Sequence, residues 1–166
     1  ESFILAKLTS HVAYTNGDYF ANEEAYIVDI LEKYSDYDVY CFTATTPQFN
    51  HVRRLAQAVK DVNLKAKTIL GGPHTRYFLT HEKDAVFDYI VTGYGINKSV
   101  ELIESIFTGN EPNFWRIDTT EYYDCPKDFS LIPEQRRIDT LWYNFFSIGC
   151  PNRCKYCVEH KVGKEI

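Results

Sequence analysis

Three cysteines near the carboxyl end of the chain have the residue type and spacing best suited to chemistry. Cys150, Cys154 and Cys157 follow the pattern C-x3-C-x2-C in a loop whose turn is set by Gly149 and Pro151. Soft thiolates that converge from one short loop suit iron–sulfur clusters, and three of them hold three irons of a [4Fe–4S] cluster while the fourth iron stays open. We therefore predict a cluster site at this loop.

Two other interpretations of the cysteines remain open. A structural zinc needs a fourth ligand, for which the nearest candidate is His160. The thiols could also be reduced bystanders. A disulfide scaffold fits poorly, because the chain is long for one and has five cysteines, an odd number. Of the other two, Cys41 is expected to be a small core residue and Cys125 a bystander in a linker.

Composition limits the classes of function. The chain has 166 residues and a net charge of −5, so no global basic field favours nucleic acid. No run of about twenty apolar residues predicts a membrane span, and unpaired, grouped cysteines favour a reducing cytoplasm. The chain contains no methionine, even at residue 1, so we expect a processed chain or a piece of a longer protein.

Strand-like and helix-like segments alternate along the first part of the chain. Apolar residues recur at helical spacing in several segments, and short β-branched or aromatic runs separate them. The predicted strands are Phe3–Leu8, Asp38–Thr43, Ala66–Leu70, Phe87–Val91 and Phe114–Ile117. The predicted helices are Ile27–Tyr34 (capped by Asn22), Val52–Val59 (opened by Pro47), His81–Ala85 and Ser99–Phe107.

This alternation predicts an open α/β fold over residues 1–118, with a parallel sheet of about five strands and helices on both faces. Right-handed crossovers would place every strand's carboxyl end on one edge. Three loops then gather there, Thr43–Thr46, Gly71–His74 and Gly93–Gly95, and ligands of such sheets bind at that edge, at the switch point in strand order. The alternative is that these are tight turns that bind nothing.

The cysteine loop, with Tyr156 just before its last cysteine, resembles the cluster loop of radical S-adenosylmethionine (SAM) enzymes. The segments Asp38–Pro47, Thr68–His74 and Asp88–Gly95 resemble the cobalamin-binding domain that precedes many radical SAM domains. Order and spacing match across most of the chain, and Gly-Gly-Pro-His is the sharpest piece outside the cysteines. The resemblance implies a Rossmann-like, cobalamin-binding type of fold.

The resemblance also implies roles for individual residues. Cys150, Cys154 and Cys157 would hold the [4Fe–4S] cluster, SAM would chelate its open iron, and Tyr156 would lie against the adenine. The cobalamin tail would contact Thr43, Thr45, Thr46, Gly71 and Gly72, while Gly93, Tyr94 and Gly95 would line the opposite wall of its slot. His74 would either touch the ligand or cap the next segment.

Two departures from the family pattern matter. The histidine motif D-x-H-x-x-G is absent, because His11 and Asp18 lack that spacing, so no protein histidine is expected to bind cobalt. Tyr94 stands where relatives usually carry glutamate, so any role of that acid is lost.

Residues 119–139 are expected to form a linker, and residues 140–166 the start of a radical SAM barrel, whose first strand is Leu141–Ile148. By resemblance, the full protein would reduce SAM to a deoxyadenosyl radical and, with methylcobalamin, transfer a methyl group. The rest of the barrel is missing, so we expect this piece to be inactive alone. The alternative function is a non-catalytic cobalamin- or nucleotide-binding module with a zinc- or cluster-stabilised tail.

Overall fold

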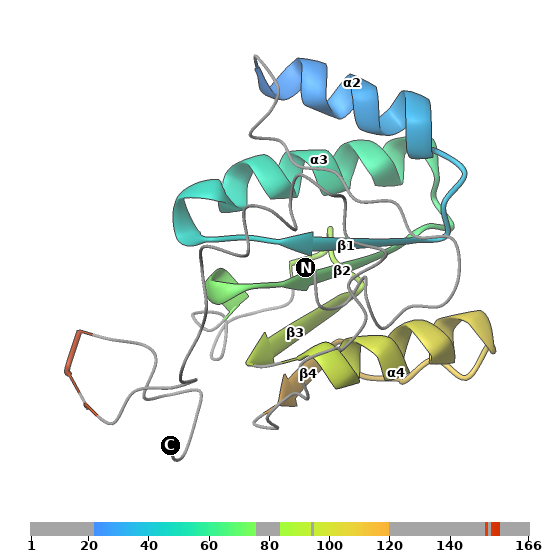
Figure 1. Ribbon diagram of the computed structural model, residues 1–166. Coiled ribbons are helices and arrows are strands. Elements are labelled where there is room, and N and C mark those ends of the chain that lie inside the picture. The colour runs from blue at the N-terminus through green and yellow to red at the C-terminus, as the bar shows by residue number, and fades with distance from the viewer. Residues whose placement is uncertain (1–21, 76–83, 94, 120–151, 153, 157–166) are drawn as a thin grey trace, which may run out of the picture.

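The computed structural model describes residues 22–75, 84–93, 95–119, 152 and 154–156 (Figure 1). A four-stranded parallel sheet forms the centre of the described part, with its strands in the order β1-β2-β3-β4. The strands are β1 (Val39–Thr43), β2 (Lys67–Gly71), β3 (Tyr89–Gly93) and β4 (Arg116–Thr119). The predicted α/β architecture with a parallel sheet is confirmed for these four strands.

Within the described residues, three α-helices accompany the sheet: α2 (Glu23–Tyr34), α3 (Phe49–Val62) and α4 (Ile96–Phe107), with a short 3-10 turn, η2 (Thr46–Gln48), before α3. The predicted cap of α2 is confirmed, because Asn22 Oδ1 accepts a hydrogen bond of 2.8 Å from the Ala25 N–H. This bond satisfies a backbone donor that the first helical turn leaves without a partner.

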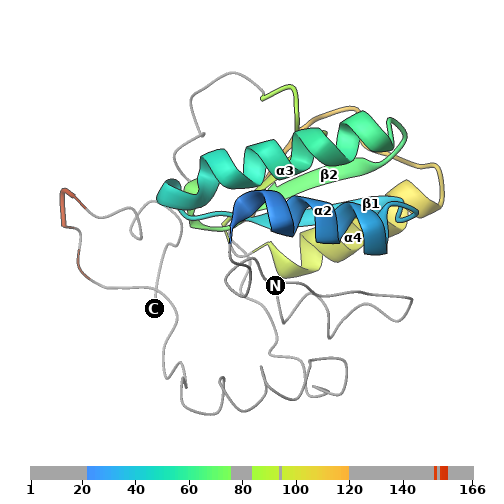
Figure 2. The same ribbon diagram turned by 90° about the horizontal axis from the view of Figure 1, so that it is seen from above.

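Helices cover both faces of the sheet, as predicted (Figure 2). Leu70 and Ile90 lie on the face that packs against α3, whereas Ile69 and Val91 lie on the face that packs against α4. Side chains alternate between the faces of a strand, so the neighbouring residues Ile69 and Leu70 of β2 contribute to different cores. Leu70 and Ile90 are almost completely buried, and each such side chain contributes roughly 1.5–3 kcal/mol relative to exposure. Helix α2 packs beside α3, with Ile30 and Leu55 in a shared cluster.

The crossovers differ from the expectation in one respect. The described strands follow chain order, yet α3 and α4 lie on opposite faces. The β1–α3–β2 and β3–α4–β4 crossovers must therefore have opposite hands, and one of them departs from the right-handed rule. β2 and β3 carry apolar side chains on both faces of the sheet, and each face must be shielded from water. Helix α3 covers one face, and helix α4 covers the other. The order also contains no reversal, so the expected switch point is not found within the described strands.

Several predicted boundaries are shifted, and three of them lie at the start of an element beside a turn. Strand β3 begins at Tyr89 rather than Phe87, because Asp84 Oδ1 accepts from the Val86 N–H at 3.0 Å and holds the preceding residues in a turn. Helix α4 begins three residues early, since the Ser99 N–H already bonds to the Gly95 carbonyl at 2.8 Å. Strand β4 begins two residues later than predicted, at Arg116.

The predicted strands Phe3–Leu8 and Leu141–Ile148 lie outside the described residues, as does most of the predicted helix His81–Ala85. Within the described residues, each helix is too short or too polar to cross a bilayer.

Candidate ligand site at the carboxyl edge of the sheet

The loops that follow β1 and β2 lie against each other. The Ala44 N–H donates to the Gly71 carbonyl at 3.3 Å, and the His74 N–H donates to the Ala44 carbonyl at 2.9 Å. Residues almost thirty positions apart in sequence therefore form one surface. It includes five of the residues predicted to contact a cobalamin tail: Thr43, Thr45, Thr46, Gly71 and Gly72.

Gly72 is required by packing between these two loops. Its φ is +88°, and a Cβ there would lie 2.3 Å from Thr43 Oγ1 and 2.8 Å from the Ala44 nitrogen. The space that a side chain would need is thus already filled by the chain itself. The sequence alone suggested close approach of a ligand at this glycine, whereas the structure explains it by loop packing.

Gly71 has a different environment. Among described residues, a Cβ at this position would meet only the Phe42 carbonyl oxygen, at 3.8 Å, which is ordinary contact. Its φ lies outside the left-handed region, so no backbone strain calls for glycine. Neither packing nor conformation in the described part of the chain explains Gly71, which is consistent with a group that approaches from outside.

His74 belongs to the same surface. Its Nδ1 lies 3.1 Å from Thr46 Oγ1, and its ring stacks on Phe49 with 4.2 Å between the ring centroids. Burial lowers the pKa of His74 below its ordinary value, because the charged imidazolium loses hydration there. Burial therefore favours the neutral form of the ring.

Thr75 was missed by the sequence analysis. Its side chain is fully buried, and its hydroxyl lies 2.8 Å from the Gly72 carbonyl and 3.2 Å from the Val91 carbonyl. One hydroxyl thereby joins the glycine turn to β3. Its position directly after Gly-Gly-Pro-His was the only signal available in the sequence.

Gly93 and Gly95, predicted to line the opposite wall, pack against the end of β4. Gly93 has φ +79°, and a Cβ there would lie 2.0 Å from the Thr119 carbonyl oxygen. A Cβ at Gly95 would lie 2.2 Å from Val91 Cγ1. Chain packing thus accounts for both glycines. Tyr94 lies outside the described residues.

The described edge loops are uncharged and rich in hydroxyl groups. Thr43, Thr45 and Thr46 are exposed, and residues 43–46, 71–75, 93 and 95 include no lysine or arginine. Gln48 Oε1 accepts from the Thr45 N–H at 3.2 Å and from the Thr45 hydroxyl at 2.7 Å. This arrangement can bind a polar ligand through hydroxyl and backbone groups. Apart from His74, these residues offer no group for acid–base catalysis.

The cysteine loop is described only in part. Cys154 is half-buried and Tyr156 is 90% exposed, whereas Cys150 and Cys157 lie outside the described residues. Within the described part of the chain, no group of three or more His, Cys, Asp or Glu side chains could hold a metal ion. Cluster ligation therefore stays a prediction. Cys41, expected in the core, is instead exposed, because β1 is the first strand of the described sheet.

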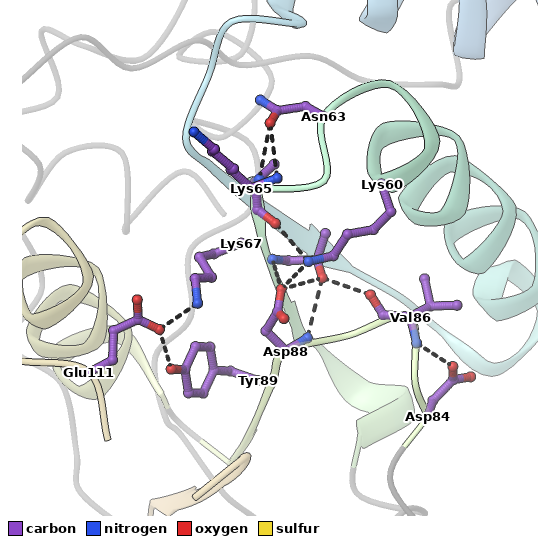
Figure 3. A network of polar contacts seen from close by, with 11 residues as sticks. Lys60, Asn63, Lys65, Lys67, Asp84, Val86, Asp88, Tyr89 and Glu111 are labelled. Carbon is purple, nitrogen blue, oxygen red and sulfur yellow. Dashed lines mark hydrogen bonds and ion pairs between the residues drawn. The ribbon is translucent and has the colours of Figure 1, made fainter. Parts of the chain in front are cut away.

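The opposite edge of the sheet carries a polar network (Figure 3). Asp88 Oδ2 accepts from Lys60 Nζ at 2.5 Å and from the Thr68 N–H at 2.8 Å. Burial raises the pKa of the Asp88 carboxyl, but the hydrogen bonds from Lys60 and Thr68 outweigh it and hold the pKa below its usual value. These contacts join α3, β2 and the start of β3.

A second part of this network involves Tyr89, whose hydroxyl donates to Glu111 Oε2 at 2.8 Å, while Lys67 Nζ lies 2.7 Å from the same oxygen (Figure 3). Burial, and then the Glu111 carboxylate, raise the pKa of Tyr89 to about 12. These contacts join β2 and β3 to the segment that follows α4.

Comparison with known proteins identifies the domain. The B12-binding domain family matches residues 4–103, which is more than half of the chain and includes both loops of the site. The chain belongs to the B12-binding domain family. The described sheet and helices are consistent with the Rossmann-like fold of B12-binding domains, and membership supports cobalamin as the cofactor of this one.

A relative extends the comparison. "Uncharacterized methyltransferase PH0819" of Pyrococcus horikoshii is 25% identical over 154 residues, which cover 79% of this chain and 33% of the relative. The chain thus spans about a third of the length of the curated relative that it matches. No solved structure matches the chain significantly.

Proposed function

We propose that this B12-binding domain binds cobalamin at the carboxyl edge of the sheet, over the surface formed by Thr43–Thr46 and Gly71–Gly72. The observation that carries the proposal is that the family match spans two loops which hydrogen-bond to each other at that edge. Cobalamin supplies a cobalt centre that can carry a methyl group, and the protein supplies the surface that holds it.

The residues present fit this ligand. The corrin ring carries neutral amide side chains, which need hydroxyl and backbone partners rather than ionic ones. The exposed threonines supply such partners, and the described loops lack basic side chains. Gly71 adds an open approach, since among described residues its missing side chain would contact only a carbonyl oxygen at 3.8 Å.

A spectral titration of the purified chain with hydroxocobalamin tests the proposal, with two matched glycine variants. Gly71→Ala adds a methyl group to the proposed surface without φ strain, and is expected to weaken binding by about tenfold or more, which corresponds to about 1.4 kcal/mol. Its unfolding free energy is expected to stay within about 0.5 kcal/mol of the unmodified chain.

Gly109→Ala is the matched control, because Gly109 has φ +72° and lies beyond α4, where an added methyl group would meet none of the described residues within 4 Å. It should destabilise the fold and leave cobalamin affinity unchanged. An unchanged cobalamin spectrum with the unmodified chain would refute the proposal. Equal affinity for the unmodified and Gly71→Ala chains would remove Gly71 from the site.

We further propose that the domain belongs to a longer radical SAM enzyme that transfers a methyl group, in which Cys150, Cys154 and Cys157 hold a [4Fe–4S] cluster and SAM binds its open iron beside Tyr156. The C-x3-C-x2-C spacing supports the cluster, and the name of the relative supports methyl transfer. Residues 119–139 would then form the linker, and residues 140–166 the start of the barrel, whose remainder would be the partner of this domain.

Anaerobic reconstitution with iron and sulfide tests this second proposal. The unmodified chain is expected to take up about four irons and to give a reducible cluster signal in electron paramagnetic resonance. Cys154→Ala should lose the signal, whereas Cys41→Ala, at an exposed position in β1, should retain it. Zinc in place of iron, or equal loss in both variants, would contradict the assignment.

A further inference from the structure

His74 connects the two loops of the ligand site. Its backbone N–H donates to the Ala44 carbonyl at 2.9 Å, its Nδ1 lies 3.1 Å from Thr46 Oγ1, and its ring stacks on Phe49. All three partners belong to the segment from the end of β1 to the start of α3, although His74 itself follows β2. The side chain therefore spans the junction between the loops.

The exposed threonines of the first loop are held in two different ways. The Thr45 hydroxyl is held by Gln48, three residues further along the same loop. The Thr46 hydroxyl is held by His74, from the other loop. A hydroxyl that already forms a hydrogen bond within the protein is held in one orientation. It therefore loses less conformational entropy when a ligand binds, and the free-energy cost of binding is lower.

We propose that His74 is a positioning residue for ligand binding: its ring fixes the Thr46 hydroxyl and holds the β1–α3 loop against the Gly71-Gly72 turn, so that both loops present one preformed surface. The inference rests on the proposed cobalamin function and adds a residue that acts through Thr46 rather than through cobalt. It also answers the question left by the sequence, which had His74 either touching the ligand or capping the next segment.

The chemistry of the contact explains why histidine suits this position. The flat ring packs on Phe49 with an interplanar angle of 31°, and its edge still offers a polar atom to Thr46. The neutral state, favoured by burial, lets this ring lie beside uncharged partners without an unpaired charge. Asparagine can place an amide where Nδ1 lies, whereas phenylalanine keeps the stacking and loses the hydrogen bond.

A double-mutant cycle in cobalamin affinity tests the proposal. His74→Phe and Thr46→Val each remove one partner of the same contact, and each is expected to weaken hydroxocobalamin binding about two- to tenfold, as for one hydrogen bond. Both substitutions break the same contact. The double variant should therefore bind hydroxocobalamin about as well as the single variant with the lower affinity. His74→Asn should restore affinity to within about twofold of the unmodified chain.

Urea unfolding of each variant separates positioning from folding. Thr46 is exposed, so Thr46→Val should leave the unfolding midpoint unchanged. If His74→Phe fails to fold, Thr46→Val decides the test alone, because unchanged affinity in that variant would overturn the inference. Additive losses of affinity, or no rescue by His74→Asn, would overturn the inference while the cobalamin proposal stands. No spectral change with the unmodified chain would overturn both.

Discussion

Replacing Gly72 with alanine should destabilise the domain far more than the same change at Gly109. Both glycines have positive φ, +88° at Gly72 and +72° at Gly109, so both substitutions force a side chain into the left-handed region. That strain costs about 1–2 kcal/mol, and alanine regains about 0.4–1 kcal/mol because it restricts the unfolded chain. The net cost of conformation alone is therefore about 1 kcal/mol at either position.

The surroundings separate the two glycines. At Gly72 a Cβ would lie 2.3 Å from Thr43 Oγ1 and 2.8 Å from the Ala44 nitrogen, whereas at Gly109 none of the described residues lies within 4 Å. Backbone at Ala44 cannot rotate away as a side chain can, and overpacking of this kind typically adds about 1–3 kcal/mol. Gly72→Ala should therefore cost about 3 kcal/mol in total, against about 1 kcal/mol for Gly109→Ala.

Gly109 is a good reference because its conformation has a local cause. It ends α4 with two capping bonds, from the Gly109 N–H to the Ile106 carbonyl at 3.2 Å and from the Asn110 N–H to the Ser105 carbonyl at 2.9 Å. The loss of unfolding free energy in Gly109→Ala therefore measures the strain of the left-handed backbone alone, without any steric clash between loops.

Equilibrium urea unfolding, followed by circular dichroism, measures both costs, and thermal unfolding checks them. For a chain of this size about 1 kcal/mol shifts the melting temperature by roughly 2–4 °C, so Gly72→Ala should lower it by about 6–12 °C. If Gly72→Ala lowered the unfolding free energy no more than Gly109→Ala, the close contact between the glycine turn and the loop after β1 would be refuted. The two loops would then not form one surface.

Two further substitutions test other contacts of the described fold. Thr75→Val removes a buried hydroxyl that bonds the glycine turn and β3, and should lower the unfolding free energy by about 1 kcal/mol or more, whereas Thr108→Val at the exposed end of α4 should stay within about 0.5 kcal/mol. Equal effects in urea would contradict the bridging role of Thr75.

Asp88→Asn removes a carboxylate whose pKa is lowered in the folded state. The stability that this carboxylate adds is therefore present above the ordinary pKa of aspartate, and it is lost as the pH falls through the pKa of the folded state. Asp88→Asn should lower the unfolding free energy at pH 7 by about 2 kcal/mol, and it should lose less stability than the unmodified chain between pH 7 and pH 3. Asp36→Asn, at an exposed position, is the control. Parallel profiles of stability against pH for all three proteins would refute the assignment.

Local patterns in the sequence were sufficient for much of the fold. The period of apolar residues identified α2 and α3, and Asn22 before two acidic residues identified the start of α2, because capping needs only a side chain three residues away. Boundaries near turns were harder. Phe87 is apolar and fully buried, like a strand residue, but Asp84 folds the chain into a turn beneath it.

Residue types and spacing alone determined that this chain alternates strands with helices, places glycine and threonine loops after its strands, and carries a cluster-type cysteine motif. Only the tertiary structure decided that packing requires glycine at position 72 but not at position 71, that Thr75 is buried as a bridge, and that His74 holds Thr46. The physical reason is distance along the chain. Periodicity and caps depend on neighbours within one or two turns, whereas the contact of His74 with Thr46 joins residues 28 positions apart, and only packing of α3 on the sheet brings them together.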